Sequence, residues 1–396
     1  MKTKLLVSAL LLTTAVVVYA YPGALRLAQQ PQPAATPVNA IAAPAAKPLV
    51  EAVFVLDTTS SMSDLIQAAK NNIWSIASNM ANAQPQPQLR IGLVAFRDRG
   101  DSYVTKVIDL SEDLDSMYAT LMDFRAQGGG DGPESVNQAL YDAVHSISWS
   151  QDPDAYQVVF LVGDAQPHMD YPDDVKYPET IRAAITKGIV VNTIQAGDNP
   201  GTQIEWEKMA ALSQGDFFKV SQGGDAIALA TPFDEEMARL AKELDDTRLY
   251  YGDSEERERA SAKVAASDKL TAMGSLSSRA QRAAFNTRTE AGSANFLGEN
   301  ELVADIEKGR VDLAKLDADQ LPEPLRELNV EDRAKVVAET KAKREELSST
   351  LEALAGQRQQ FLEESFRDNA EVEESLDYQI LGAVRKQAKE KGLHYE

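Results

Sequence analysis

The chain contains no cysteine among its 396 residues, which excludes disulfides, zinc–thiolate sites and thiol nucleophiles. Histidine is scarce, with three residues, so no serine–histidine–aspartate arrangement can be argued. Positive charge is also in deficit, because 40 lysines and arginines stand against 61 aspartates and glutamates, a formal net charge of −21. Nucleic acid and anionic membrane surfaces repel such a chain, so we expect neither as a partner. The acidic balance suits a soluble protein with affinity for divalent cations.

The N-terminal residues have the pattern of an export signal. A basic start over residues 1–4 precedes an uncharged, mostly apolar run over 5–20, and the Val-Tyr-Ala of 18–20 has the spacing of a signal-peptidase site. We predict a signal peptide over 1–20; the alternative is an uncleaved anchor, because the uncharged stretch continues to Leu25. In either case we expect an extracytoplasmic protein, periplasmic or secreted. If residues 1–20 are not cleaved, they would tether the protein to the inner membrane.

Three further segments differ in composition. Residues 21–48 are rich in alanine, proline and glutamine, which indicates an extended linker. Over 49–230 apolar strands alternate with helical patterns, which predicts an α/β domain with a doubly wound, mostly parallel, Rossmann-like sheet flanked by helices. Over 231–396 charged helical patterns replace the strands, so we expect an all-helical region. The expected strands cover 50–57, 89–97, 103–109, 157–163, 188–195 and 217–220. The helices expected between them cover 62–82, 112–125, 134–148, 178–187 and 203–213.

In the helical region we expect a helix that starts at Ser254 after Asp253, a good N-cap residue, and two further helices with clear ends. Asn329 can cap a helix from 330 to about 366, and a last helix over about 372–391 would end before Gly392, a residue typical of helix C-termini. One face of the longer helix has the spacing of a coiled-coil or helical-hairpin seam. The seam residues are Leu347, Leu351, Leu354, Arg358 and Phe361. The seam predicts packing against a second helix, with self-association as one form of it.

Oxygen-bearing side chains follow two predicted strands and fill one glycine-rich loop. Asp57, Thr59 and Ser61 alternate directly after the first strand, and Asp164 ends the strand over 157–163. The loop over 128–134 reads Gly-Gly-Gly-Asp-Gly-Pro-Glu. Ligands of open α/β sheets bind at the carboxyl ends of the strands, so these groups could converge at one sheet edge. Oxygen ligands alone suit a hard divalent cation.

These residues resemble the metal-ion-dependent adhesion site of the von Willebrand factor type A domain family, whose pattern is Asp-x-Ser-x-Ser, then a distant Thr and a distant Asp. Asp57, Ser61 and Asp164 match the pattern, and Thr59 is a conservative departure from Ser. Asp131 stands where the family has Thr, within a glycine-rich segment that resembles a variant of bacterial members. A carboxylate there would strengthen metal retention and weaken the attraction for a partner's carboxylate.

The resemblance implies binding rather than turnover. It implies Mg²⁺, or Mn²⁺ or Ca²⁺, at Asp57, Thr59, Ser61, Asp131 and Asp164, with one open position for an Asp or Glu carboxylate of a protein partner. On this hypothesis the chain is a metal-dependent protein-binding or adhesion module of the cell envelope and not an enzyme.

Two other functions compete with this hypothesis. Haloacid-dehalogenase-type phosphoryl hydrolases also place an Asp after an apolar strand, but they need a cation near the transferred group, and no Lys or Arg occurs over residues 126–175. The second competing function is a structural scaffold that acts through the helical region.

Individual residues of this region could also have purely structural roles. The hydroxyls of Thr59, Ser60 or Ser61 could cap the following helix, although capping would leave Asp164 and the three glycines unexplained. The tripeptide over 99–101, Arg-Gly-Asp, is expected in a turn between strands. His168 is near Asp164 and could touch the rim of the metal site, but we expect it to be an exposed bystander.

Overall fold

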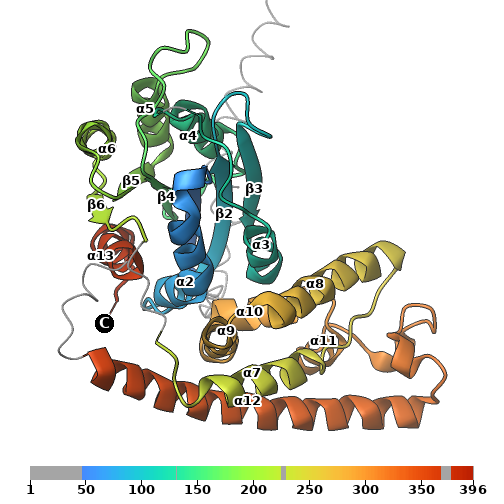
Figure 1. Ribbon diagram of the computed structural model, residues 1–396. Coiled ribbons are helices and arrows are strands. Elements are labelled where there is room, and N and C mark those ends of the chain that lie inside the picture. The colour runs from blue at the N-terminus through green and yellow to red at the C-terminus, as the bar shows by residue number, and fades with distance from the viewer. Residues whose placement is uncertain (1–46, 131, 224–228, 367–375, 396) are drawn as a thin grey trace, which may run out of the picture. The chain divides into compact units, whose positions relative to one another are not determined.

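The computed structural model describes residues 47–130, 132–223, 229–366 and 376–395 (Figure 1). The predicted signal peptide, almost all of the predicted linker, and Asp131 lie outside these residues. Within the described ranges, no helix combines the length and the hydropathy that crossing a membrane requires.

A six-stranded sheet has the strand order β3-β2-β1-β4-β5-β6. Its neighbouring strands are parallel except β2 and β3, which are antiparallel because the connection between them is too short for a crossover helix. The strands are β1 (Leu49–Asp57), β2 (Gln88–Phe96), β3 (Thr105–Ser111), β4 (Tyr156–Gly163), β5 (Ile189–Ala196) and β6 (Phe217–Val220). The doubly wound, mostly parallel sheet predicted from the sequence is confirmed.

Each face of the sheet is covered by helices over its own apolar core. Alternate residues of β1 point to opposite faces, so Phe54 and Leu56 join one core while Val53 and Val55 join the other. The first core packs under α2 and α3, and the second under α4, α5 and α6 (Figure 1). These helices are α2 (Ser63–Ala81), preceded by a 3₁₀ turn (Ser60–Met62), α3 (Leu114–Leu121), α4 (Val136–His145), α5 (Tyr177–Lys187) and α6 (Pro200–Ser213).

The described residues that follow β6 are mainly helical, as expected. Asp253 and Glu256 form a capping box at the start of α8, and the amide of Asp332 donates to Asn329 Oδ1 at 2.9 Å, which caps α12. The helices are α7 (Asp234–Asp245), α8 (Ser254–Met273), α9 (Leu276–Arg288), α10 (Glu290–Leu297), α11 (Leu302–Glu307), α12 (Val330–Phe366) and α13 (Leu376–Ala388). Short 3₁₀ turns cover Leu313–Lys315, Glu323–Leu325 and Lys389–Lys391, the last of which ends at Gly392 with φ of 76°.

Two of these helices have partners that their own sequences do not specify. The seam of α12 packs on α7 and α9 of the same chain, where Leu347 and Leu351 are buried beside Met237. Self-association through this region stays a prediction. Helix α13 returns to the sheet and contacts α2 and β4, so that Ile380 and Val384 complete the core that contains Phe54.

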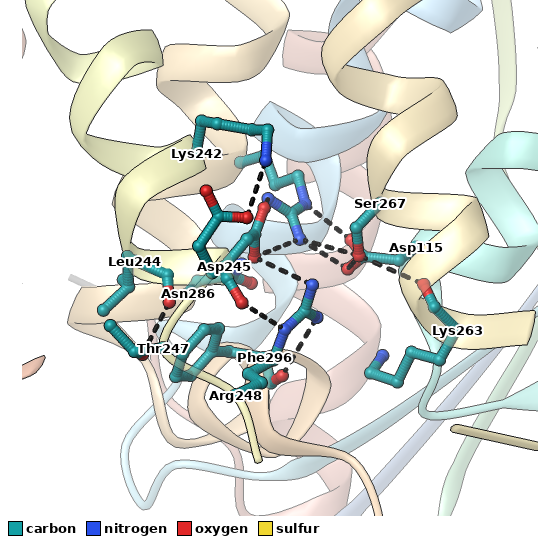
Figure 2. A network of polar contacts seen from close by, with 12 residues as sticks. Asp115, Lys242, Leu244, Asp245, Thr247, Arg248, Lys263, Ser267, Asn286 and Phe296 are labelled. Atoms are coloured by element: carbon teal, nitrogen blue, oxygen red, sulfur yellow. Dashed lines mark hydrogen bonds and ion pairs between the residues drawn. The ribbon is translucent and has the colours of Figure 1, made fainter. Parts of the chain in front are cut away.

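A buried network of charged and polar side chains joins the sheet to the helices that follow it (Figure 2). At its centre Arg282 of α9 donates to Asp115 of α3 and to Asp245 of α7. Asp115 also accepts hydrogen bonds from Ser267 of α8 and from Asn295 of α10. Since residues 47–396 form one compact unit, the division of the chain at residue 230 stays a prediction.

Candidate functional site

The segments that follow β1, β2 and β4 meet at the carboxyl end of β1. Leu56 pairs with Val162 of β4, and Asp57 pairs with Phe96 of β2, so the residues that follow all three strands emerge at the same sheet edge. The amide of Thr58 continues the ladder by donating to the Phe96 carbonyl at 2.9 Å. This register, which local sequence cannot supply, brings Asp57 and Asp164 to one place.

The carboxylate of Asp57 has one satisfied oxygen and one unsatisfied oxygen. Oδ1 accepts hydrogen bonds from the Thr59 amide at 2.8 Å and from Thr59 Oγ1 at 2.7 Å, and Thr59 Oγ1 lies 3.3 Å from Ser61 Oγ. Oδ2 is buried and has no hydrogen-bond partner among the described residues. Asp57 itself has no exposed surface. A buried carboxylate oxygen with no donor is costly unless a cation or another donor meets it.

The electrostatics of Asp57 agree with this geometry. Burial is the main cause that raises the pKa of Asp57 to about 7; the charge of Asp164 acts in the same direction, and the hydrogen bonds from Thr59 act against it. The backbone amide of Asp164 also faces the carboxylate and lowers the pKa, but it does not reach hydrogen-bonding geometry with Oδ2. A bound cation would favour the ionised carboxylate, which is the form that a metal ligand needs.

Asp164 is positioned by tight packing behind it. A Cβ atom on Gly163 would lie 3.0 Å from Asp57 Cβ and 3.1 Å from Trp206 Cη2, so only glycine allows β4 to end against Asp57. Asp164 Oδ2 accepts from Gln222 Nε2 at 2.7 Å, and the same nitrogen lies 3.1 Å from the Ser61 carbonyl. Gln222 follows β6 and was not identified from the sequence, which carries no motif at that position.

The glycine-rich loop lies directly against the Asp57 segment. Ser60 Oγ donates to the Gly128 carbonyl at 2.7 Å, and a Cβ atom on Gly129 would lie 3.0 Å from Thr59 Cβ and 2.8 Å from Glu134 Oε1. Gly129 adopts φ of 74°, a conformation that favours glycine. The loop therefore reaches the site, although Asp131 itself lies outside the described residues.

Helix capping does not explain the hydroxyls. Thr59 occupies the N-cap position of the 3₁₀ turn, yet its side chain makes no capping hydrogen bond and turns to Asp57 instead. The following helix, α2, likewise has no side-chain cap.

The expectation for His168 was wrong, because this side chain is buried rather than exposed. Its Nδ1 lies 2.8 Å from Asp170 Oδ1, its Nε2 lies 3.4 Å from Asp98 Oδ2, and its ring stacks on Tyr171 with centroids 4.0 Å apart. Asp170 and Tyr171 are neighbours in the sequence, but Asp98 is distant, and the residues around His168 do not reveal that contact.

The two arginines that follow β2 are engaged by other groups. Arg97 donates to the carbonyls of Thr58 and Arg125 and stacks on Tyr103, with its guanidinium carbon 4.4 Å from the ring centroid. Arg99 pairs with two aspartates of the loop over 166–176. The Arg-Gly-Asp tripeptide lies in the connection between β2 and β3, as expected, and its aspartate accepts from the Gly129 amide at 3.0 Å.

The described donors are two carboxylates and two hydroxyls, all oxygen. No group of three or more acidic or histidine side chains is placed to hold a metal ion within the described ranges. That finding leaves out serine and threonine hydroxyls as well as Asp131. The unsatisfied Oδ2 of Asp57 and the two neighbouring hydroxyls fit a hard cation that keeps several waters.

Comparison with known proteins finds a family match over the sheet region. Residues 51–230 match the family model described as von Willebrand factor A domain. Comparison with curated proteins finds no match. Among solved structures, proximal thread matrix protein 1 from the mussel byssus is 17% identical with a TM-score of 0.36, and the match covers 44% of this chain and 42% of that one.

Two further solved structures have similar scores. The mussel protein with a zinc-occupied MIDAS motif is 18% identical with a TM-score of 0.35 and the same coverage of both chains. The SpRpn10 VWA domain is 12% identical with a TM-score of 0.34, and the match covers 44% of this chain and 88% of that domain. This chain therefore spans less than half the length of the mussel protein.

Proposed function

Because residues 51–230 are a von Willebrand factor A domain, a class of domain that generally mediates protein–protein interaction, we propose that this chain binds a protein partner through a divalent cation. The cation is held by Asp57, Thr59, Ser61, Asp131 and Asp164. The observation that carries this proposal is the buried Oδ2 of Asp57, a carboxylate oxygen without a donor beside two hydroxyls and a second acid.

The donor chemistry supports Mg²⁺ over softer metals, with Mn²⁺ or Ca²⁺ as substitutes. The ligand set contains no nitrogen or sulfur, and hydroxyl, carboxylate and water oxygens suit hard cations. A partner's Asp or Glu carboxylate completes the coordination. The three carboxylates of the site outweigh the charge of one divalent ion, so the ion is retained strongly and attracts the partner's carboxylate weakly.

The surroundings of the site support binding rather than phosphoryl transfer. Arg97 and Arg99 follow β2 closely, but their guanidinium groups are committed to carbonyls and to aspartates. A transferred phosphoryl group would need such a cation free at the site. The place of action is the cell envelope or the exterior, which rests on the export pattern of residues 1–20 alone.

Metal binding is tested by calorimetric titration of Mg²⁺ and Mn²⁺ into the full chain. We expect a single site in the wild type and loss of binding in Asp57→Ala. The control is Asp154→Ala, which removes the same charge from an exposed side chain before β4. Equal affinity in the wild type and Asp57→Ala would refute the metal site.

Partner binding needs a separate test. Capture from an envelope fraction should recover a partner in the presence of Mg²⁺ and lose it on addition of a chelator. Recovery should also fail with Asp57→Ala and persist with Asp154→Ala. A partner that remains bound in the chelator would show that the domain interacts without the metal.

A further inference from the structure

A polar cavity of about 410 Å³ lies between the C-terminal half of α2, helix α9 and helix α12. Helix α9 contacts both of the others (Figure 1). The volume is within the range of pockets that enclose small molecules. The cavity lies apart from the candidate metal site, since none of the four described residues among the proposed metal ligands lines it.

The described lining of this cavity differs sharply in charge from the rest of the chain. It contains no aspartate or glutamate, although the chain has 61 of them among 396 residues. It contains two arginines, Arg288 and Arg358, and most of its other members carry amides or hydroxyls. In a chain of net charge −21, a cavity whose described lining has arginines and no carboxylates favours an anionic occupant. Arg358 is already paired with Asp234, which lies outside that lining, so the attraction comes from Arg288.

The two arginines play different parts. Arg358 is buried and oriented, because its Nε donates to Asp234 Oδ1 at 2.8 Å and its Nη2 donates to Ser277 Oγ at 3.0 Å. Arg288 is exposed and makes no ion pair within the described residues. The guanidinium of Arg288 can therefore pair with an anionic group of a ligand, and guanidinium groups suit carboxylate and phosphate.

Two amides of the lining lack partners. Oε1 of Gln281 is buried with no hydrogen-bond partner among the described residues, while its Nε2 lies 3.5 Å from Ser277 Oγ. Asn72 is 4% exposed, and its side chain makes no hydrogen bond to the part of the chain that is described. A buried polar atom without a partner costs stability, so Oε1 of Gln281 calls for a ligand group. The amide of Asn72 is available to contact the same ligand. Ionised carboxylate and phosphate oxygens only accept hydrogen bonds, so Oε1 of Gln281 requires a donor such as a hydroxyl.

We propose that this cavity binds a small anion that carries hydroxyl groups, such as a sugar acid or a sugar phosphate. The anionic group contacts Arg288, and the hydroxyls contact the amides of Asn72 and Gln281. This inference does not rest on the metal site.

The experiment is calorimetric titration of the full chain, in the presence of a chelator, with four probes: gluconate, glucose 6-phosphate, glucose and inorganic phosphate. We expect gluconate or glucose 6-phosphate to bind with a Kd of about 1 mM or tighter, and their comparison distinguishes a carboxylate from a phosphate source. Glucose and inorganic phosphate should each bind at least about tenfold more weakly, because each lacks one half of the recognised chemistry.

Variants locate the binding. Arg288→Gln should weaken the binding anion by about tenfold or more, since a charge-assisted hydrogen bond is lost. Gln281→Met, which removes the unsatisfied amide without needing a new partner, should also weaken it. The control is Arg182→Gln, which removes an exposed arginine from α5 on the other face of the sheet.

Three results would overturn the proposal. The first is the absence of binding by both hydroxylated anions. The second is equal binding by inorganic phosphate, which would indicate an adventitious ion only. The third is affinity unchanged by Arg288→Gln.

Discussion

The guanidinium of Arg282 and the carboxylate of Asp115 form a two-pronged ion pair, with Nε to Oδ1 at 2.6 Å and Nη2 to Oδ2 at 2.5 Å. Both side chains are buried, and they come from α9 and from α3 beneath the sheet. Asp245 of α7 supplies a second carboxylate to the same arginine at 2.8 Å. One arginine thus links the von Willebrand factor A domain to the helices that follow it.

Removal of this arginine should destabilise the whole described fold. Arg282→Met removes the two-pronged counter-ion of the buried Asp115 and leaves Asp245 with its longer contact to Arg248, at 3.4 Å. We expect a loss of about 3–5 kcal/mol in the free energy of unfolding. Urea unfolding followed by circular dichroism measures it. The control, Arg239→Met, breaks exposed ion pairs on α7 and should change stability little. Similar losses in the two variants would contradict the central role of Arg282.

The same pair predicts a pH dependence on the acid side. Arg282 holds the pKa of Asp115 well below its usual range. Because the folded-state pKa is depressed, the contribution of Asp115 is present above the pKa of the unfolded chain and is lost as pH falls below about 4. The stability of the wild type should therefore fall more steeply than that of Asp115→Asn between about pH 5 and about pH 3, an interval that contains the ordinary pKa of aspartate. Parallel curves in urea unfolding would contradict this prediction.

Asp57 should destabilise the metal-free domain and stabilise the metal-bound one. Asp57→Asn removes a buried charge. In a chelator, at a pH above the Asp57 pKa of about 7, the free energy of unfolding of the variant should exceed that of the wild type by on the order of 2 kcal/mol. Saturating Mg²⁺ at about 100 times its Kd should stabilise the wild type by about 2.7 kcal/mol and leave the variant unchanged. A variant less stable than the metal-free wild type would show that the Asp57 charge is satisfied by the protein itself.

Gly163 should tolerate no side chain. In Gly163→Ala the new methyl group would meet Asp57 Cβ at 3.0 Å and Trp206 at 3.1 Å, both in the rigid core. We expect a loss of about 1–3 kcal/mol in stability and weaker metal binding, because β4 and Asp164 must move. Gly356→Ala in α12 has open space around it and should be neutral or stabilising. Unchanged metal affinity in Gly163→Ala would show that Asp164 is not held by this contact.

Much of the local structure could be predicted because its causes are local. The strand that ends at Asp57 is a run of apolar residues buried on both faces, and α12 begins after Asn329 because that side chain caps it. The capping box of Asp253 and Glu256 is likewise contained in four consecutive residues. Such signals need no knowledge of distant segments.

The candidate site was predictable only as a set of residue types. Asp57, Thr59 and Ser61 follow one strand, and their mutual hydrogen bonds are short-range. The contribution of Gln222 depends on the place of β6 in the sheet, where β4 and β5 lie between it and β1, and no motif indicates it. The contact of His168 with Asp98 likewise depends on a residue distant in the sequence.

The sequence by itself determined the elements of this protein, the order of its strands and helices along the chain, and the acids and hydroxyls at the ends of the strands. Apolar periodicity and caps act within a few residues, so they can be recognised without a structure. Only the tertiary structure decided that α13 returns to the sheet, that the seam of α12 meets α7 and α9, and that Oδ2 of Asp57 is left without a donor. An apolar face does not specify which other face covers it, and the pKa of a carboxylate depends on groups brought near by the whole fold.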